Sequence, residues 1–245
     1  FDRMEMWAGA LGGEKPEKEV KATVQCIKVF KEILDTERSY VRDLNRLESE
    51  YIKPLKQEAG LISSEDLGLI FNNSENLLRI NSELLACLQS GVRRISRNGE
   101  IPSICEVAGV FKNEFVRVMP FFKVYSVYCH RYPAALDRLS VLREVNRELA
   151  SFLQKREARK KNAQSSVESL LIKPVQRICK YPLLFRELLK FMRQILEYRP
   201  HDAELKDHVA QLEKTLEEVQ RLADDVNTKV SVAEKQDQVM KIYQE

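Results

Sequence analysis

The segment "SLLIKPVQRICKYPLLFRELLK", Ser169 to Lys190, decides how the whole chain is interpreted. It is apolar on most faces, which predicts a central, heavily packed helix, yet Pro174 and Pro182 lie within it. A proline inside a helix removes one backbone hydrogen bond and crowds the preceding turn, at a cost of about 3 kcal/mol. We therefore expect local bends at both prolines, held in place by packing.

One face of this predicted helix is not purely apolar. Ile172, Gln176 and Lys180 are spaced by four residues, so they share a face. Such a strip on a core helix has two explanations, which spacing alone does not separate. It can be a surface left for a partner, or a solvated edge on which Lys180 lays its alkyl stem while its ammonium stays in water.

The rest of the chain is typical of an all-helical protein. Eight Gly and eight Pro in 245 residues leave few turns, and apolar residues recur at steps of three and four along most of the sequence. Neither alternating strand patterns nor an internal repeat is present. The sequence predicts an all-α fold, an elongated bundle of about six long helices.

The first long helix is predicted to begin at Lys21 and to end near Pro54. Two acidic residues, Glu37 and Glu48, stand in its apolar stripe where the rhythm calls for an apolar side chain. A carboxylate there must be paired, or it must lie at the edge of the stripe and face solvent or a partner. The edge position is favoured, because neighbouring apolar residues widen the stripe.

Other regions of the chain are also predicted to be helical. Ser63 or Ser64 is expected to cap a second helix, with acidic residues in its first turn. Aromatic residues crowd the region 104–142, where Pro120 and Pro133 divide at least two helices, and they are interpreted as core.

The last helix, residues 200–245, has the cleanest period and carries Asp202 near its start. Asn227 directly follows the apolar stripe residue Val226 and interrupts a run of good helix formers. Taken singly, this asparagine says little about function.

Charge and cysteine usage exclude several classes of protein. Forty basic and 37 acidic residues give a net charge of +3, which does not indicate a dedicated nucleic-acid binder. The five cysteines are an odd number without a C-x-x-C pair, so buried thiols in a reducing compartment are favoured over disulfides or zinc. The sequence shows neither an apolar run long enough for a membrane span nor a signal peptide.

Motifs for covalent catalysis are missing. Phosphate-binding glycine loops and a G-x-S-x-G elbow are absent from the sequence. His201 and His208 could share a helix face with Glu204, but ordinary surface histidines are favoured over a metal site. We therefore predict no cofactor, no metal and no covalent chemistry.

A basic run ends the helix predicted for "VNRELASFLQKREARKKN", residues 145–162. It could contact anionic lipid or RNA, but aromatic residues are not interleaved and acidic residues flank it. A solvated helix end is favoured for its five cations, which are Lys155, Arg156, Arg159, Lys160 and Lys161.

Three motifs together resemble one known family. "LLIKPVQRICKYPLLFRELLK" closely resembles the most invariant motif of Dbl-homology domains, the modules of guanine nucleotide exchange factors for Rho-family GTPases. "FKEILDTERSYVRDLNRLESEYIKPL" is similar to the first helix of that family, and "LADDVNTKV" to part of its last long helix. The motifs appear in the family's order, and the similarity spans roughly Lys21 to Lys235.

The resemblance implies a mechanism and a set of site residues. In the family, the glutamate at the position of Glu37 bonds switch I of the GTPase, and residues matching Lys180 and Asn227 engage switch II. This disrupts the Mg²⁺ site, GDP leaves and GTP replaces it, without covalent chemistry. Ile172 and Gln176 match positions that also face the GTPase, and an isoleucine there leans toward a Rac- or Rho-type partner.

The same resemblance implies a domain organisation. Residues 1–20 are expected to be a linker, 21–235 the Dbl-homology domain, and 236–245 the end of a helix leading toward a following domain, which in the family is usually a pleckstrin-homology domain. Because the chain begins with Phe1, it is expected to be a piece of something longer. We expect a cytoplasmic protein recruited to membranes with its GTPase, with membrane contact only through a neighbouring domain.

Two other functions stay open. The chain could be a non-catalytic helical scaffold that kept the fold and binds a GTPase without releasing its nucleotide. The presence of Glu37, Lys180 and Asn227 together favours exchange over this alternative. A membrane-surface or nucleic-acid binder that uses the basic run comes last.

Overall fold

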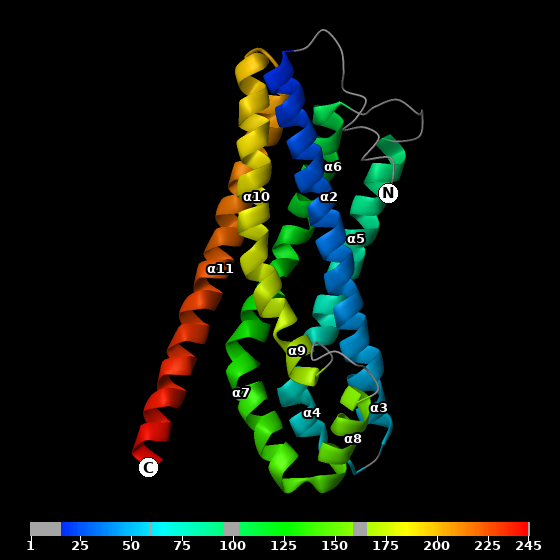
Figure 1. Ribbon diagram of the computed structural model, residues 1–245, viewed down its shortest axis with the longest axis vertical. Coiled ribbons are helices and arrows are strands. Elements are labelled where there is room, and N and C mark those ends of the chain that lie inside the picture. Colours follow the sequence, from blue (N-terminus) through cyan, green and yellow to red (C-terminus); the bar gives the residue numbers. More distant parts are fainter. Residues whose placement is uncertain (1–15, 59, 96–102, 159–165, 245) are drawn as a thin grey trace. The chain divides into compact units, whose positions relative to one another are not determined.

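The computed structural model describes residues 16–58, 60–95, 103–158 and 166–244, with side chains up to Thr228. The described residues are helical almost throughout and contain no strand, which confirms the all-helical prediction. Seven of the helices in this part of the chain have twelve residues or more. In chain order the elements are α2 (Glu17–Arg46), the π-helix η1 (Leu47–Ile52), α3 (Lys53–Gln57), α4 (Ser64–Phe71), α5 (Ser74–Ile95), α6 (Ile104–Val118), the 3₁₀ turn η2 (Met119–Phe122), α7 (Lys123–Val145), α8 (Arg147–Ala158), α9 (Val167–Leu171), α10 (Lys173–Tyr198) and α11 (Ala203–Gln244) (Figure 1).

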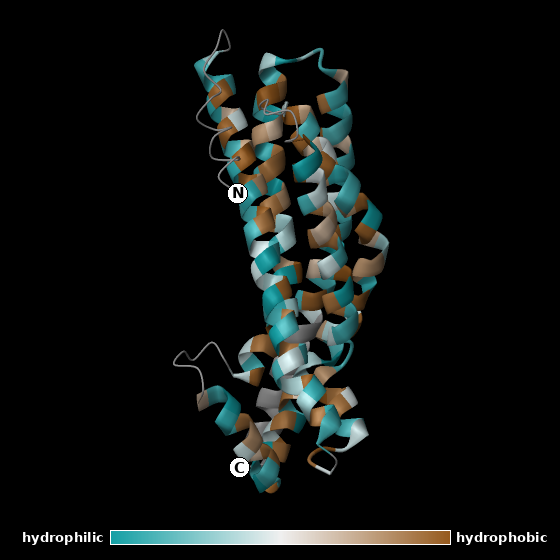
Figure 2. Ribbon diagram, turned by 90° about the vertical axis from the view of Figure 1, so that its right-hand side faces the viewer, coloured by the Kyte–Doolittle hydropathy of each residue, from teal (hydrophilic) through white to brown (hydrophobic). Residues whose placement is uncertain are grey.

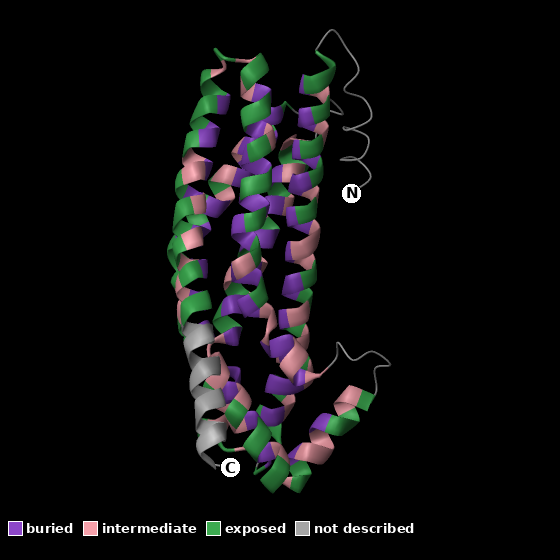
Figure 3. Ribbon diagram, turned by 60° about the vertical axis from the view of Figure 1, so that its left-hand side comes forward, coloured by how far each residue is buried: buried purple, intermediate pink, exposed green. Residues whose placement is uncertain are grey.

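The helices group into two compact units. Unit 1 comprises residues 1–39, 80–121 and 180–221, and unit 2 comprises 40–79, 122–179 and 222–245. Helices α2, α5, α10 and α11 contribute residues to both. Within each unit the helices alternate apolar and polar residues along their length (Figure 2), and buried residues recur turn by turn (Figure 3).

Unit 1 is built around aromatic rings from three helices. Phe111 of α6 lies 6.0 Å from Phe30 of α2 and 5.0 Å from Phe185 of α10, ring centroid to ring centroid, both edge to face. Phe115 contacts Phe185 and Tyr181 in the same manner, at 4.9 Å and 5.7 Å. Edge-to-face packing is the favoured arrangement of aromatic rings, so the predicted aromatic core is confirmed here.

Unit 2 has a mostly aliphatic core, with one tyrosine and one phenylalanine in the buried cluster. It holds fourteen buried side chains: Leu47, Tyr51, Ile52, Leu55, Leu61, Ile70, Phe71, Leu139, Leu142, Leu149, Leu153, Val167, Leu170 and Leu171. The predicted aromatic core also extends into α7, where Tyr125 and Tyr128 are buried. Phe121 is the exception, because 58% of it is exposed.

The second predicted helix is in fact two helices. Ser63 caps α4 by accepting a hydrogen bond from the Asp66 backbone at 3.0 Å, as predicted. The chain then breaks at Asn72, whose φ of +48° is one that asparagine tolerates better than most residues. The amides of Asn72 and Asn73 donate to the carbonyl oxygens of Tyr128 and Val124, so side-chain hydrogen bonds to α7 hold the break.

The first helix also departs from its prediction at both ends. It begins at Glu17, earlier than Lys21, and the chain remains helical beyond Pro54 to Gln57. Between these ends lies a π-helical segment, where the Lys53 N–H bonds the carbonyl of Glu48 five residues back. Glu48 itself is half-buried and pairs with Lys53 at 3.4 Å.

Fewer of the prolines end a helix than predicted. Pro120 does separate α6 from α7, but Pro133 lies inside α7, so it does not end a helix. In the opening motif the break falls at Ile172, between α9 and α10. Pro174 is the second residue of α10, where the missing N–H has no intrahelical partner to lose, whereas Pro182 lies in the helix interior.

The contact between α4 and α7 makes a prediction about pH. Arg138 donates to both oxygens of Asp66, at 2.6 Å and 3.2 Å, and this hydrogen bond lowers the pKa of that carboxyl. Because the pKa is lower in the folded state, the stabilisation is present above the unfolded value and is lost as the pH falls through the folded one. Arg138→Ala should therefore lower the urea unfolding midpoint at pH 7, by less at pH 3. An equal difference at both pH values would contradict this account.

Candidate functional site

Glu37 is fully buried in unit 1, with none of its surface exposed. The hydroxyl of Tyr181 in α10 lies 2.8 Å from Glu37 Oε2 and 3.2 Å from Asn81 Oδ1 of α5. A hydroxyl has a single proton to donate, and the carboxyl oxygen is the closer acceptor, so we assign this hydrogen bond to Glu37. The predicted edge position is wrong for Glu37, because the carboxyl is enclosed and paired.

Tyr181 is itself held rigidly. Its ring is fully buried and packs edge to face against Phe115, and its centroid lies 6.2 Å from that of Phe185. A side chain fixed by packing presents its hydroxyl at one place, so the donor to Glu37 is preorganised. Sequence spacing did not single out Tyr181, although its position four residues before Phe185 places both on the core side of α10.

Lys180 lies on the exposed side of α10 in unit 1. Its side chain is 45% exposed, and its ammonium lies 3.4 Å from Glu32 of α2, which is also exposed. An exposed ion pair of this kind contributes little to stability. The ammonium can therefore exchange Glu32 for an acidic group of a partner at small cost.

The unit 2 part of α10 continues the predicted strip. Gln176 is exposed and Ile172 is half-buried, at the turn where α9 ends. The Gln176 N–H donates to the Ile172 carbonyl at 3.1 Å, so the first turn of α10 is hydrogen-bonded to the residue at which α9 ends. Arg177, the next residue, is buried instead, and its guanidinium lies 5.9 Å from the ring centroid of Tyr40. Residues four positions apart, such as Gln176 and Lys180, are exposed, whereas the residue next to Gln176 is buried.

Asn227 lies exposed on α11 in unit 2. Its side-chain oxygen accepts a hydrogen bond from the thiol of Cys179, with a sulfur–oxygen distance of 3.2 Å. Two residues earlier, Asp225 accepts from the hydroxyl of Ser126 in α7 at 2.9 Å. This turn of α11 is therefore held by side chains from two other helices.

Both contacts involve sequence neighbours of Lys180. Tyr181, which follows it, binds Glu37 in unit 1, and Cys179, which precedes it, binds Asn227 in unit 2. Each contact lies within its own unit, and each joins two motifs that lie far apart in the sequence. The sequence alone gave no sign of either hydrogen bond.

The histidines and cysteines do not form a metal centre in the described residues, where no three His, Cys, Asp or Glu side chains are placed to hold an ion. His201 is exposed as predicted, but His208 is buried, with Nε2 3.6 Å from Glu204 Oε1. The surface assignment of His208 is therefore wrong. All five cysteines are free; Cys87 and Cys179 are half-buried, and the other three are buried.

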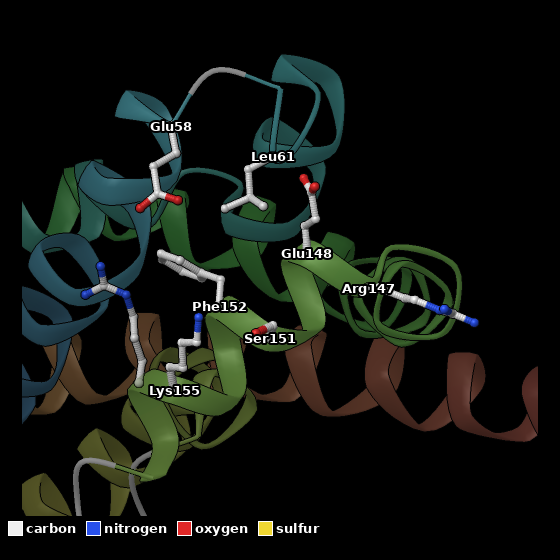
Figure 4. Close-up of a pocket in the computed structure, with 8 residues that line it drawn as sticks. Glu58, Leu61, Arg147, Glu148, Ser151, Phe152 and Lys155 are labelled. Carbon is white, nitrogen blue, oxygen red and sulfur yellow. The ribbon is translucent and has the colours of Figure 1, made fainter.

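The basic run borders a pocket of about 560 Å³ within unit 2 (Figure 4). Figure 4 shows Phe152 and Leu61 in its lining, with carboxylates and cations around them. Of the run, only Lys155 and Arg156 belong to the described residues, and the Arg156 guanidinium lies 4.4 Å from the Phe152 ring centroid. The mixed charge of the lining, which comprises Glu58, Leu61, Arg147, Glu148, Ser151, Phe152, Lys155 and Arg156, does not favour an anionic ligand.

Comparison with known proteins identifies the family. Residues 29–227 match the RhoGEF domain, so the chain belongs to this family and the resemblance seen in the sequence is confirmed. None of the helices in the described residues is both long and apolar enough to cross a membrane.

Two relatives show how far the similarity reaches. The mouse "Pleckstrin homology domain-containing family G member 2" is 36% identical over 162 residues, which are 66% of this chain and 11% of that protein. The human "Rho guanine nucleotide exchange factor 4" is 31% identical over 186 residues, 75% of this chain and 26% of that protein. The chain thus spans about a tenth of the length of the first curated relatives that it matches.

A solved structure supports the fold. The structure described as "Vav1 inhibited by an allosteric inhibitor" superposes with a TM-score of 0.71 at 23% identity, covering 97% of this chain and 38% of that one. At this identity the likeness concerns the fold alone.

The buried hydrogen bond to Glu37 can be tested on stability. Tyr181→Phe keeps the ring packing but takes away this donor, so we expect the free energy of unfolding to fall by about 1–3 kcal/mol. Urea unfolding followed by circular dichroism measures the change. Tyr198→Phe is the matched control, because Tyr198 is 38% exposed, and it should change stability by less than about 0.5 kcal/mol. Equal effects of the two substitutions would show that the hydroxyl contributes nothing.

Proposed function

We propose that this chain is a guanine nucleotide exchange factor for a Rho-family small GTPase. Its membership of the RhoGEF domain family supports this, as does the name of its relative "Rho guanine nucleotide exchange factor 4". The observation that carries the proposal is the surroundings of Lys180. This exposed cation is flanked by the two residues that hold Glu37 and Asn227.

In the proposed mechanism the domain binds the nucleotide-free GTPase better than the nucleotide-bound form. Lys180 supplies a flexible ammonium and Asn227 an amide that can donate and accept, and both engage switch II. Glu37 accepts backbone donors of switch I. The Mg²⁺ site and phosphate contacts of the GTPase are disrupted, and nucleotide affinity falls by the same factor by which the domain prefers the empty state.

The burial of Glu37 adds a step to this mechanism. In the free domain its carboxyl is enclosed and bound by Tyr181. To reach switch I it must become accessible, and switch backbone N–H groups must replace the Tyr181 hydroxyl as donors. The new donors would offset the loss of the Tyr181 hydrogen bond, because the carboxyl again accepts a hydrogen bond.

Ile172 and Gln176 are proposed as further GTPase contacts. The isoleucine, half-buried at the α9–α10 turn, would meet an aromatic side chain of the GTPase, and it leans toward a Rac- or Rho-type partner. We propose residues 21–235 as the catalytic domain; the linker predicted for 1–20 is cut short by α2, which begins at Glu17. A cytoplasmic protein recruited to membranes with its GTPase fits this organisation.

Nucleotide release tests the proposed function directly. GTPases of the Rac and Rho types are loaded with a fluorescent GDP analogue and mixed with excess GTP, with and without the chain. We expect the fluorescence decay to accelerate for at least one of them. If the chain binds a GTPase but no member of the panel releases nucleotide faster than it does alone, the domain is a non-catalytic scaffold.

Single substitutions test the site within that assay. Lys180→Ala and Asn227→Ala should each lower the release rate by roughly tenfold or more, the effect expected from losing a charged or preorganised contact made in the transition state. Because both residues are exposed, each substitution should change the free energy of unfolding, measured by thermal unfolding, by less than about 0.5 kcal/mol. Lys206→Ala, an exposed lysine of α11, is the control and should leave release unchanged. A large loss of stability would instead mark Lys180 or Asn227 as structural.

A further inference from the structure

The side chains of Cys179 and Asn227 are in contact. Cys179 lies in α10 and Asn227 in α11, 48 positions further along the sequence. The sulfur lies 3.2 Å from the asparagine oxygen, so the thiol is the donor and the amide oxygen the acceptor. Cys179 is half-buried, whereas Asn227 is exposed. The half-buried thiol therefore donates a hydrogen bond to an exposed side chain.

The thiol is in the protonated form that this contact needs. Burial raises the pKa of Cys179 above its ordinary value, and the Asp224 carboxylate raises it further. At neutral pH the sulfur thus carries the proton that it donates. A thiolate, in contrast, would repel the amide oxygen.

An asparagine amide has one acceptor atom and one NH₂ group with two donors. Without a fixed partner, the exposed side chain of Asn227 would sample both orientations of the amide. The thiol selects one of them, because it binds the oxygen and leaves the NH₂ group for another acceptor. The hydrogen bond of Ser126 with Asp225 fixes the same turn of α11, so the backbone that carries Asn227 is also held in unit 2.

We infer that Cys179 is a positioning residue, which orients the amide of Asn227 so that its NH₂ group donates to the GTPase. This inference rests on the proposed exchange function. In this role Cys179 acts only through Asn227. Substituting Cys179 should therefore have no effect on GDP release when Asn227 is absent. If Cys179 were only structural, its substitution would have the same effect with and without Asn227.

A double-substitution cycle tests the dependence on Asn227. Cys179→Ala should slow fluorescent-GDP release by about two- to fivefold, the effect of losing one weak neutral hydrogen bond. In the Asn227→Ala background, measured with more protein because release is slow, the same substitution should change the rate by less than about 1.5-fold. Cys179→Ser retains a donor and should stay within about twofold of wild type. An equal effect in both backgrounds, or none in either, would overturn the inference.

Cys87→Ala is the matched control. Cys87 is also a half-buried thiol with one polar contact, to the guanidinium of Arg117 in unit 1. Its removal should leave GDP release unchanged. If Cys87→Ala slows release as much as Cys179→Ala does, the effect comes from general loss of packing and the inference fails.

A second measurement does not require a GTPase. The side-chain NH₂ resonances of Asn227, assigned by their loss in Asn227→Ala, should shift in Cys179→Ala and approach the values of an unrestrained asparagine. They should not move in Cys87→Ala. If wild type accelerates release from no GTPase, the proposed function fails, yet these resonances still decide whether Cys179 holds Asn227. Unchanged resonances in Cys179→Ala would overturn the positioning role whatever the exchange assay shows.

Discussion

The hydrogen bond from Tyr181 to Glu37 is the constraint on which unit 1 depends. A carboxyl in the apolar stripe of α2 would be costly without a donor, and Tyr181 supplies one at 2.8 Å. The donor is in place because Phe115 and Phe185 fix the tyrosine ring. The aromatic core thus holds α2 and α10 in the register that lets a polar group remain buried.

The helical period of α10 explains how one motif contains both buried core residues and exposed residues. Successive residues of a helix are rotated by 100°, so Lys180 can be exposed while its neighbours face other helices. Tyr181 turns to Glu37 and Cys179 to Asn227, each within its own unit. The motif is therefore mostly apolar because it is a core helix, and its few polar residues are those that meet solvent or other polar groups.

The helix boundaries are where prediction from sequence was wrong most often. The break at Asn72 depends on a positive φ and on amide hydrogen bonds to carbonyls more than fifty residues away in the sequence. The π-helical turn after Arg46 lets the chain stay helical beyond Pro54, and Pro133 is accommodated inside α7. Tertiary packing overrides local preference at each of these positions, so periodicity and proline positions could not reveal them.

The sequence by itself determined the helical class, the aromatic core and the exposed positions of α10, because these follow from a period of 3.6 residues and from composition. It also identified Glu37, Lys180 and Asn227 as candidates through their motifs. Only the tertiary structure decided that Glu37 is enclosed by its neighbours and that Cys179 binds Asn227. Burial and hydrogen-bond partners depend on which helices lie side by side, and contacts across 144 and 48 positions leave no local trace in a sequence.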